Sequence, residues 1–205
     1  MDPNELIRKK FDVRRMASPP ILCWMGTGRH KLHNASVGRN LLAELFAELG
    51  YTKGAEIGVD RAYYSVVMLE KNPSLSLVLV DAWQGQRGGE HCLDAYKRLA
   101  PYREVGRVDI QRDKSLIVAK TVPPDSLDFV YIDSQRDFNA VMMDLIEWGR
   151  KVRPGGMISG RGYCHLFETG VVRAVDAYTE AHYIRDFYIT RDIEPNYFFI
   201  KTGKT

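Results

Sequence analysis

The sequence has few cysteines and no apolar run long enough to cross a membrane. Its 205 residues include 3 cysteines, Cys23, Cys92 and Cys164, which are far apart in the chain. A dispersed and odd-numbered set favours neither a disulfide framework nor a C-x-x-C metal site, so a reducing compartment is expected. Apolar stretches fall short of the roughly 20 residues that span a bilayer, and the first residues lack the basic and apolar regions of a signal peptide. We therefore expect a cytoplasmic protein with no membrane partner.

The sequence also lacks a strong excess of one charge. Lysine and arginine total 29 against 26 acidic residues, which gives a net charge of +3. Nucleic-acid-binding proteins concentrate basic residues in a stripe, often with aromatic residues between them. Here the basic clusters at 8–10, 14–15 and 29–31 are local and suit a solvated arm or an anionic partner. These features favour a small-molecule partner over a nucleic acid.

The chain divides into a short N-terminal extension and one domain. An Asp-Pro pair at positions 2 and 3 predicts the start of a helix that runs to about Met16. A Ser-Pro-Pro break and a stretch without periodicity follow it. We predict an extension over 1–33 and a domain over 34–205. The extension is expected to pack over a cofactor mouth or on another subunit of a homo-oligomer, and a chain that lacks 1–20 is expected to fold.

Strands and helices alternate through the predicted domain. Strands are predicted near 55–59, 75–80, 107–111, 127–132, 157–159, 184–190 and 197–201, and helices near 37–49, 61–71, 90–99, 114–120, 138–148 and 171–178. This alternation predicts right-handed crossovers and parallel strands, and the last two strands, which have no helix between them, predict an antiparallel hairpin. The fold expected is a doubly wound, Rossmann-like α/β domain. Its seven-stranded sheet is mainly parallel and has an antiparallel C-terminal hairpin.

Three residues with ligand-binding chemistry stand at the ends of the first, second and fourth predicted strands. Gly58, Asp81 and Asp133 stand at strand ends, and the carboxyl ends of parallel strands meet at one edge of a sheet, where ligands bind. A glycine lets the backbone approach a ligand, and a carboxylate accepts hydrogen bonds from both hydroxyls of a ribose. A single acid at a strand end is more often a helix cap or a solvated group, and a single glycine in such a turn is weak evidence for a ligand. Their order along the chain, however, matches that of a nucleoside site.

Three stretches of the chain have the letters of known motifs. Residues 54–65 read G-A-E-I-G-V-D-R-A-Y-Y-S, residues 128–133 read D-F-V-Y-I-D, and residues 153–160 read R-P-G-G-M-I-S-G. The first resembles motif I of class I S-adenosylmethionine-dependent methyltransferases, written E-I-G-V-x-x-G-x-x-S in one bacterial subfamily. The other two resemble that subfamily's D-F-V-Y-I-D-G-D-H and R-P-G-G-x-I-S-G patterns. The resemblance covers about 35–201 and implies S-adenosylmethionine as cofactor.

The resemblance also implies which residues bind that cofactor. Glu56 and Gly58 face its methionine part, Asp81 its ribose, and Trp83 and Gln84 border its adenine. The remaining members of the implied site are Val59, Ser65, Asp113, which contacts the adenine amine, and Asp133. For Trp83, ordinary hydrophobic cover is an equally good interpretation.

The chain departs from the family pattern at three places. Ala62 replaces the second glycine of motif I, which indicates a tighter or reshaped loop. The family's G-D-H after Asp133 becomes Ser-Gln-Arg136, and its H-D after Gly160 becomes Arg161 followed by glycine. Metal-dependent relatives have acids at these positions, and a divalent ion needs several oxygen ligands. Because only Asp133 is kept and an arginine stands where a cation is expected, we predict no bound metal.

These departures suggest a catalytic mechanism. Arg136 and Arg161 are candidates to bind an anionic acceptor or to stabilise a developing oxyanion. Asp133 and His165 are candidate bases, of which Asp133 has the better position and His165 the intrinsic pKa nearer neutrality. Tyr163 is a further hydrogen-bond donor nearby. The function expected is metal-free O-methylation of a small polar acceptor.

Blander interpretations of the same residues stay open. Arg136 can cap the helix that follows it, Arg161 can lie on the surface, and His165 can be a solvated loop residue. A catalytically degenerate module that only binds S-adenosylmethionine is the alternative function.

Overall fold

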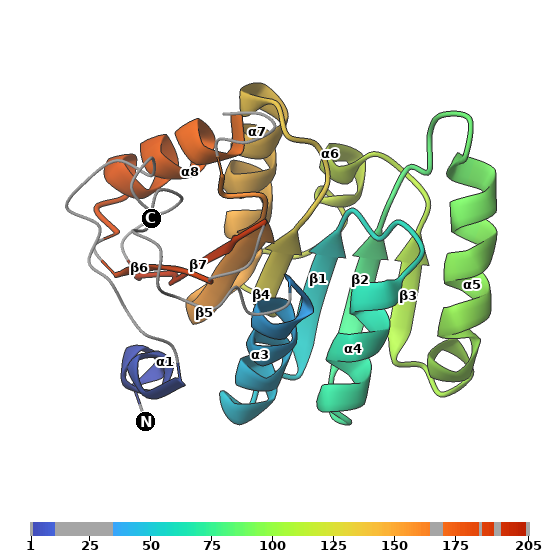
Figure 1. The fold of residues 1–205 in the computed structure, drawn as a ribbon, viewed down its shortest axis with the longest axis horizontal. Coiled ribbons are helices and arrows are strands. Elements are labelled where there is room, and N and C mark those ends of the chain that lie inside the picture. The colour runs from blue at the N-terminus through green and yellow to red at the C-terminus, as the bar shows by residue number, and fades with distance from the viewer. Residues whose placement is uncertain (1, 11–34, 165–169, 185, 191–193, 204–205) are drawn as a thin grey trace.

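The computed structural model describes residues 2–10, 35–164, 170–184, 186–190 and 194–203. A seven-stranded sheet forms its centre, in the order β3-β2-β1-β4-β5-β7-β6 (Figure 1). The strands are β1 (Lys53–Ile57), β2 (Ser76–Val80), β3 (Val108–Gln111), β4 (Leu127–Ile132), β5 (Val152–Arg161), β6 (Phe187–Ile189) and β7 (Asn196–Ile200). The first five are parallel, and β7 runs antiparallel to both β5 and β6. The predicted fold class, including the C-terminal hairpin, is therefore confirmed.

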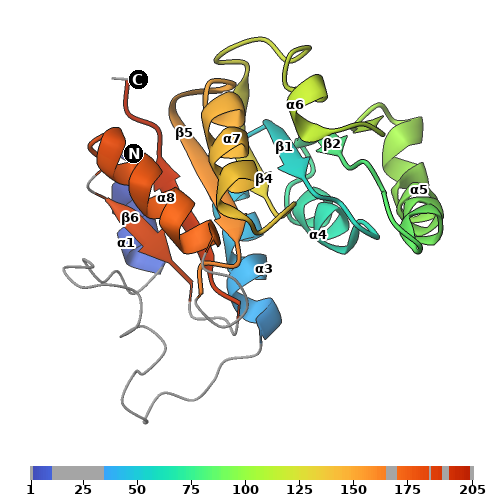
Figure 2. The ribbon, with the colours of Figure 1, turned by 90° about the horizontal axis from the view of Figure 1, so that it is seen from above.

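Helices cover both faces of the sheet (Figures 1 and 2). One layer consists of α3 (Ala35–Glu48), α4 (Tyr63–Lys71) and α5 (Gly88–Glu104), and the other of α6 (Ser115–Val118), α7 (Phe138–Gly149) and α8 (Gly170–Ala181). Alternate residues of β2 explain its continuous apolar sequence, because Leu77 and Leu79 enter one core and Val80 enters the other. Among the described residues, no helix has the length and apolar character that crossing a bilayer requires.

Two elements, α5 and β5, extend furthest beyond their predicted limits. The helix predicted to end near Leu99 continues as α5 to Glu104, with Pro101 inside it. A proline removes one backbone donor, and Leu99 and Tyr102, on either side of it, pack on the core. β5 begins at Val152 rather than near 157, and its register with β4 is irregular between Val152 and Met157. Tertiary packing overrides the local breaking signals at both places.

The first helix, α1 (Pro3–Lys10), packs on the domain itself. Ile7 is fully buried in the core cluster that also contains Tyr188 and Phe198. The hydroxyl of Tyr188 donates a hydrogen bond to Asn4 Oδ1 at 2.8 Å, so α1 lies beside β6 (Figures 1 and 2). Part of the predicted extension thus contributes to the core. Residues 11–33 lie outside the described part, so the predicted domain boundary and a role of the arm in a homo-oligomer stay predictions.

Candidate functional site

The strand order brings Gly58, Asp81 and Asp133, the residues predicted at strand ends, together at one edge of the sheet. β1 lies between β2 and β4, where the chain reverses its direction of strand addition. The Gly58 amide donates to Val80 O at 2.8 Å, and the Asp133 amide donates to Ile57 O at 2.7 Å. The ends of β1, β2 and β4 are therefore joined by hydrogen bonds. This reversal point is where open α/β sheets bind their ligands.

The turn between β1 and α4 requires a glycine at its first position. Gly58 has a φ of +91°, and a Cβ there would lie 2.2 Å from the carbonyl oxygen of Asp133. Ala62, at the N-cap of α4, is fully buried and has a φ of 61° and a ψ of 25°. Ala62 thus adopts the left-handed conformation that a glycine takes more easily, at a cost of roughly 1–2 kcal/mol. The turn accommodates this departure from motif I by backbone strain.

Asp81 holds this turn against the end of β2. Its Oδ2 accepts hydrogen bonds from the amides of Val59 and Asp60, both at 2.9 Å, and its Oδ1 accepts one from the amide of Trp83 at 2.7 Å. A carboxylate offers about four acceptor sites, so three bonds leave about one for a ligand. Sequence reasoning missed this structural role of Asp81.

The residues predicted to border adenine differ in exposure. Trp83 is 6% exposed, and its indole Nε1 donates to Asp60 O at 2.7 Å. The indole therefore supports the turn as well as covering it. Gln84 and Asp113 are exposed beyond the ends of β2 and β3, and Asp113 Oδ1 accepts a hydrogen bond from the amide of Lys114 at 2.7 Å. Their contacts with adenine stay predictions.

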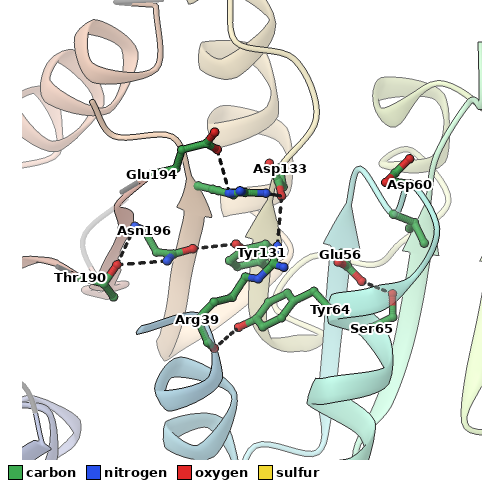
Figure 3. A network of polar contacts seen from close by, with 12 residues as sticks. Arg39, Glu56, Asp60, Tyr64, Ser65, Tyr131, Asp133, Thr190, Glu194 and Asn196 are labelled. Carbon is green, nitrogen blue, oxygen red and sulfur yellow. Dashed lines mark hydrogen bonds and ion pairs between the residues drawn. The ribbon is translucent and has the colours of Figure 1, made fainter. Parts of the chain in front are cut away.

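Glu56 is a buried acid in the middle of the site (Figure 3). The hydroxyl of Ser65 on α4 donates a hydrogen bond to Glu56 Oε2. Burial raises the pKa of Glu56 to about 8, against the lowering effect of the Ser65 hydrogen bond, and Asp133 raises it further. Glu56 therefore keeps its proton at neutral pH.

Asp133 lies between two arginines. Its Oδ2 is 3.6 Å from Arg161 Nη1 and 3.8 Å from Arg39 Nη1. Burial raises the pKa of Asp133 to about 6, although Arg161, Arg39 and Arg136 all lower it. Arg39 comes from α3, and its guanidinium stacks 4.7 Å over the ring of Tyr64 (Figure 3). Sequence reasoning missed Arg39, because no motif surrounds it.

Glu194 brings the two predicted arginines together. Its Oε2 lies 2.9 Å from Arg136 Nη2 and 3.0 Å from Arg161 Nε. Arg136 does not cap α7, since the Asp137 side chain accepts the hydrogen bond from Ala140 N at 3.0 Å. Arg161 is only 32% exposed, so it is not an ordinary surface residue. Sequence reasoning missed Glu194, which lies between the last two predicted strands, because no motif surrounds it.

The two remaining candidates are placed differently. The hydroxyl of Tyr163 donates to Asp176 Oδ1 on α8 at 2.5 Å, so its expected role as a donor in the site is not supported. His165 lies outside the described residues, and its role as a base stays a prediction.

Two hydrogen-bond networks support the site. Below Asp133, the hydroxyl of the buried Tyr131 donates to Asn196 Oδ1 at 2.7 Å. The backbone amide of Asn196 donates to Thr190 Oγ1 at 2.8 Å (Figure 3). These bonds join β4 to the C-terminal hairpin.

The second network surrounds Asp144 on α7. Ser134 donates to Asp144 Oδ2 at 2.7 Å, and Ser115 at the start of α6 donates to Asp144 Oδ1. Trp148 Nε1 in turn donates to Ser115 Oγ at 2.7 Å. The loops after β3 and β4 are therefore both fixed to α7. Ser134, which stands where the family pattern has a glycine, makes one of these bonds.

The side chains around Asp133 do not fit a divalent cation. Asp133 and Glu194 both face Arg161, and a guanidinium offers donors but no acceptor. A divalent ion needs several oxygen ligands. In the part of the chain that the structure describes, no group of three or more His, Cys, Asp and Glu side chains is placed to hold a metal.

Comparisons with known proteins agree with this fold. Among solved structures, the chain is similar to the O-methyltransferase TomG from Streptomyces achromogenes, involved in tomaymycin synthesis and solved with S-adenosylmethionine. The identity is 16% and the TM-score 0.64, over 89% of this chain and 87% of that one. It is also similar to an O-methyltransferase from Bacillus cereus in complex with S-adenosylhomocysteine, at 13% identity and a TM-score of 0.62, over 98% and 91% of the two chains. These similarities show a shared fold.

The chain is also similar to a third solved structure and matches a protein family. The third is an S-adenosylmethionine-dependent O-methyltransferase from Thermotoga maritima, at 11% identity and a TM-score of 0.61, over 89% and 71% of the two chains. No curated protein matches the chain. Residues 55–160, more than half of the 205, match the family described as a methyltransferase domain, and the chain therefore belongs to that family.

Proposed function

We propose that this chain transfers a methyl group from S-adenosylmethionine to an oxygen atom of a small polar acceptor, without a metal ion. Membership of the methyltransferase family supports the reaction class. The observation that carries the finer proposal is the environment of Asp133. It is a carboxylate at a strand end beside the motif I glycine, held by two arginines, with a pKa raised by burial to about 6.

The residues at the strand edge fit the cofactor. There is no room for a Cβ at Gly58, and a glycine there lets the backbone of the turn approach the cofactor closely. Asp81 keeps about one acceptor site for a ribose hydroxyl. Glu56 with Ser65 would hold the methionine part, and Trp83, Gln84 and Asp113 the adenine side. The cofactor, when bound, supplies an electrophilic methyl group on a positively charged sulfur.

Asp133 is the proposed base. An acceptor hydroxyl must lose its proton as its oxygen attacks the methyl group, and that proton passes to the Asp133 carboxylate. A base acts best when its pKa lies near the working pH, and about 6 is nearer neutrality than an ordinary aspartate. Burial thus brings the pKa of Asp133 close to the intrinsic pKa of a histidine, so His165 is no longer favoured as the base on that ground.

The charges around Asp133 favour a negatively charged acceptor. Arg39, Arg136 and Arg161 carry three positive charges against the two negative charges of Asp133 and Glu194, which leaves one positive charge. Guanidiniums bind carboxylates and developing oxyanions through paired hydrogen bonds. Arg136 and Arg161 would hold such a group at the mouth of the site.

Methyl transfer can be measured with tritiated S-adenosylmethionine on a panel of hydroxy acids, with and without EDTA. Turnover is expected to be unchanged by EDTA, and loss that magnesium restores would reject the metal-free proposal. Binding of S-adenosylhomocysteine in calorimetry without transfer to any acceptor would favour a cofactor-binding module that has lost catalysis.

A matched pair of variants tests the arginines. Arg161→Ala is expected to lower turnover by about 10-fold or more, the scale of a lost charged hydrogen bond. Arg150→Ala, at the exposed end of α7, is expected to leave it unchanged. Equal turnover of both variants would remove Arg161 from the acceptor site.

A further inference from the structure

A buried phenol in the hairpin has no hydrogen-bond partner. Tyr197 on β7 is 0% exposed, and its hydroxyl is without a partner among the described residues. A buried polar atom is nearly always hydrogen-bonded, and each exception calls for an explanation. Another buried phenol, Tyr131 on β4, follows this rule by donating to Asn196. Tyr197 therefore has hydrogen-bonding capacity that the described chain does not use.

Tyr197 lines a small pocket at the ends of β4 and β5. Asp133, Ser134, Arg136 and Arg161 form its polar side, and Val141 and Val171 belong to its apolar side. Its cavity volume is about 10 Å³, enough for about one water molecule and far below the roughly 300–1,000 Å³ of a typical ligand pocket. The pocket therefore suits one oxygen atom at the end of an acceptor rather than a whole acceptor.

A glycine gives the phenol its place beside this pocket. Gly160 is paired with Tyr197 across the antiparallel ladder of β5 and β7. A Cβ on Gly160 would lie 2.4 Å from the Tyr197 hydroxyl oxygen and 2.4 Å from Ile132 O at the end of β4. The missing side chain lets the hydroxyl cross β5 toward β4. Gly160 belongs to the R-P-G-G-M-I-S-G stretch, so this motif glycine has a steric reason here.

We propose that the Tyr197 hydroxyl binds a carboxylate of the acceptor, which enters the pocket between Arg136 and Arg161. This inference rests on the proposed function, and it deepens it by naming the acceptor class as a hydroxy-carboxylic acid. The two guanidiniums select for negative charge, and the phenol supplies an additional neutral donor. Five N–H donors allow a guanidinium to contact a second carboxylate beside Glu194. Tyr197 thus determines which acceptors bind.

The test is binding of benzoate and of its neutral analogue benzamide, followed by NMR in the presence of S-adenosylhomocysteine. The wild type is expected to bind benzoate more tightly than benzamide. Tyr197→Phe removes only the oxygen atom and is expected to weaken benzoate about 10-fold, the scale of one hydrogen bond to a charged group. Because the lost hydroxyl had no partner, the variant is expected to be at least as stable as the wild type.

Tyr178→Phe is the matched control, since this buried phenol on α8 lies against Gly149 at the far end of α7. It is expected to leave benzoate affinity unchanged. Equal affinities of the wild type and Tyr197→Phe, or tighter binding of benzamide or inorganic phosphate than of benzoate, would overturn the inference. Tyr197-dependent benzoate binding without affinity for S-adenosylhomocysteine would uphold the carboxylate site at Tyr197 but reject the proposed function, and with it the assignment of that site to a methyl acceptor.

Discussion

Glu56 is expected to make the stability of the protein depend on pH. Burial raises its pKa from an ordinary 4.5 to about 8, against the Ser65 hydrogen bond. Between these values the unfolded chain releases the proton and the native chain keeps it. Stability is therefore fully present below pH 4.5 and is lost as the pH rises toward 8, by about 1.4 kcal/mol for each pH unit. At pH 7 the buried acid costs about 3 kcal/mol.

Glu56→Gln removes this titration while keeping the shape of the side chain and an acceptor for Ser65. The free energy of unfolding of the variant, minus that of the wild type, is expected to increase by about 3–4 kcal/mol between pH 5 and pH 8. Any penalty for burying the new amide group is the same at each pH, so only the slope matters. Urea unfolding at pH 5, 6, 7 and 8 measures both proteins.

Glu70→Gln is the matched control, because Glu70 is an exposed carboxylate on the same helix as Ser65. Its difference from the wild type is expected to stay constant over the same pH range. A pH-independent difference for Glu56→Gln, within about 1 kcal/mol, would show that the native protein does not keep the Glu56 proton, and the reasoning from burial would fail.

Three further substitutions test other parts of the structure. Asp81→Ala is expected to weaken S-adenosylhomocysteine binding by about 1.5–3 kcal/mol, and wild-type affinity in calorimetry would remove Asp81 from the cofactor site. Ala62→Gly is expected to lower the free energy of unfolding by about 1 kcal/mol less than Ala95→Gly, because Ala62 has a left-handed backbone and Ala95 a helical one. Equal losses in urea unfolding would contradict the backbone strain at Ala62. Ile7→Ala is expected to cost about 2–4 kcal/mol, so a chain without residues 1–20 should keep its fold in circular dichroism but unfold at lower urea. A loss below about 1 kcal/mol would contradict the packing of α1.

Local patterns in the sequence were sufficient to predict the fold and its ligand-binding edge. The mainly apolar letters of β2 and β4 require cover on both faces, which a parallel sheet with alternating helices provides. Once the strands are parallel, Gly58, Asp81 and Asp133 must lie at one edge of the sheet, because the carboxyl ends of parallel strands share that edge. The strand order, with β1 between β2 and β4, then places them side by side. The three stretches that resemble known motifs then indicated a methyltransferase. None of this depends on the exact limits of an element, and so errors such as the early end predicted for α5 did no harm.

Only the tertiary structure decided the chemistry at that edge. Arg39, Glu194 and Tyr197 come from α3, the segment before β7, and β7, and no local pattern relates them to Asp133. The pKa of Asp133 and that of Glu56 are raised first by burial, and burial is set by how whole layers pack. Residue letters specify which groups can ionise. Desolvation and the charges brought near by the fold decide which of them do, and so which can act as base, donor or anchor for an acceptor.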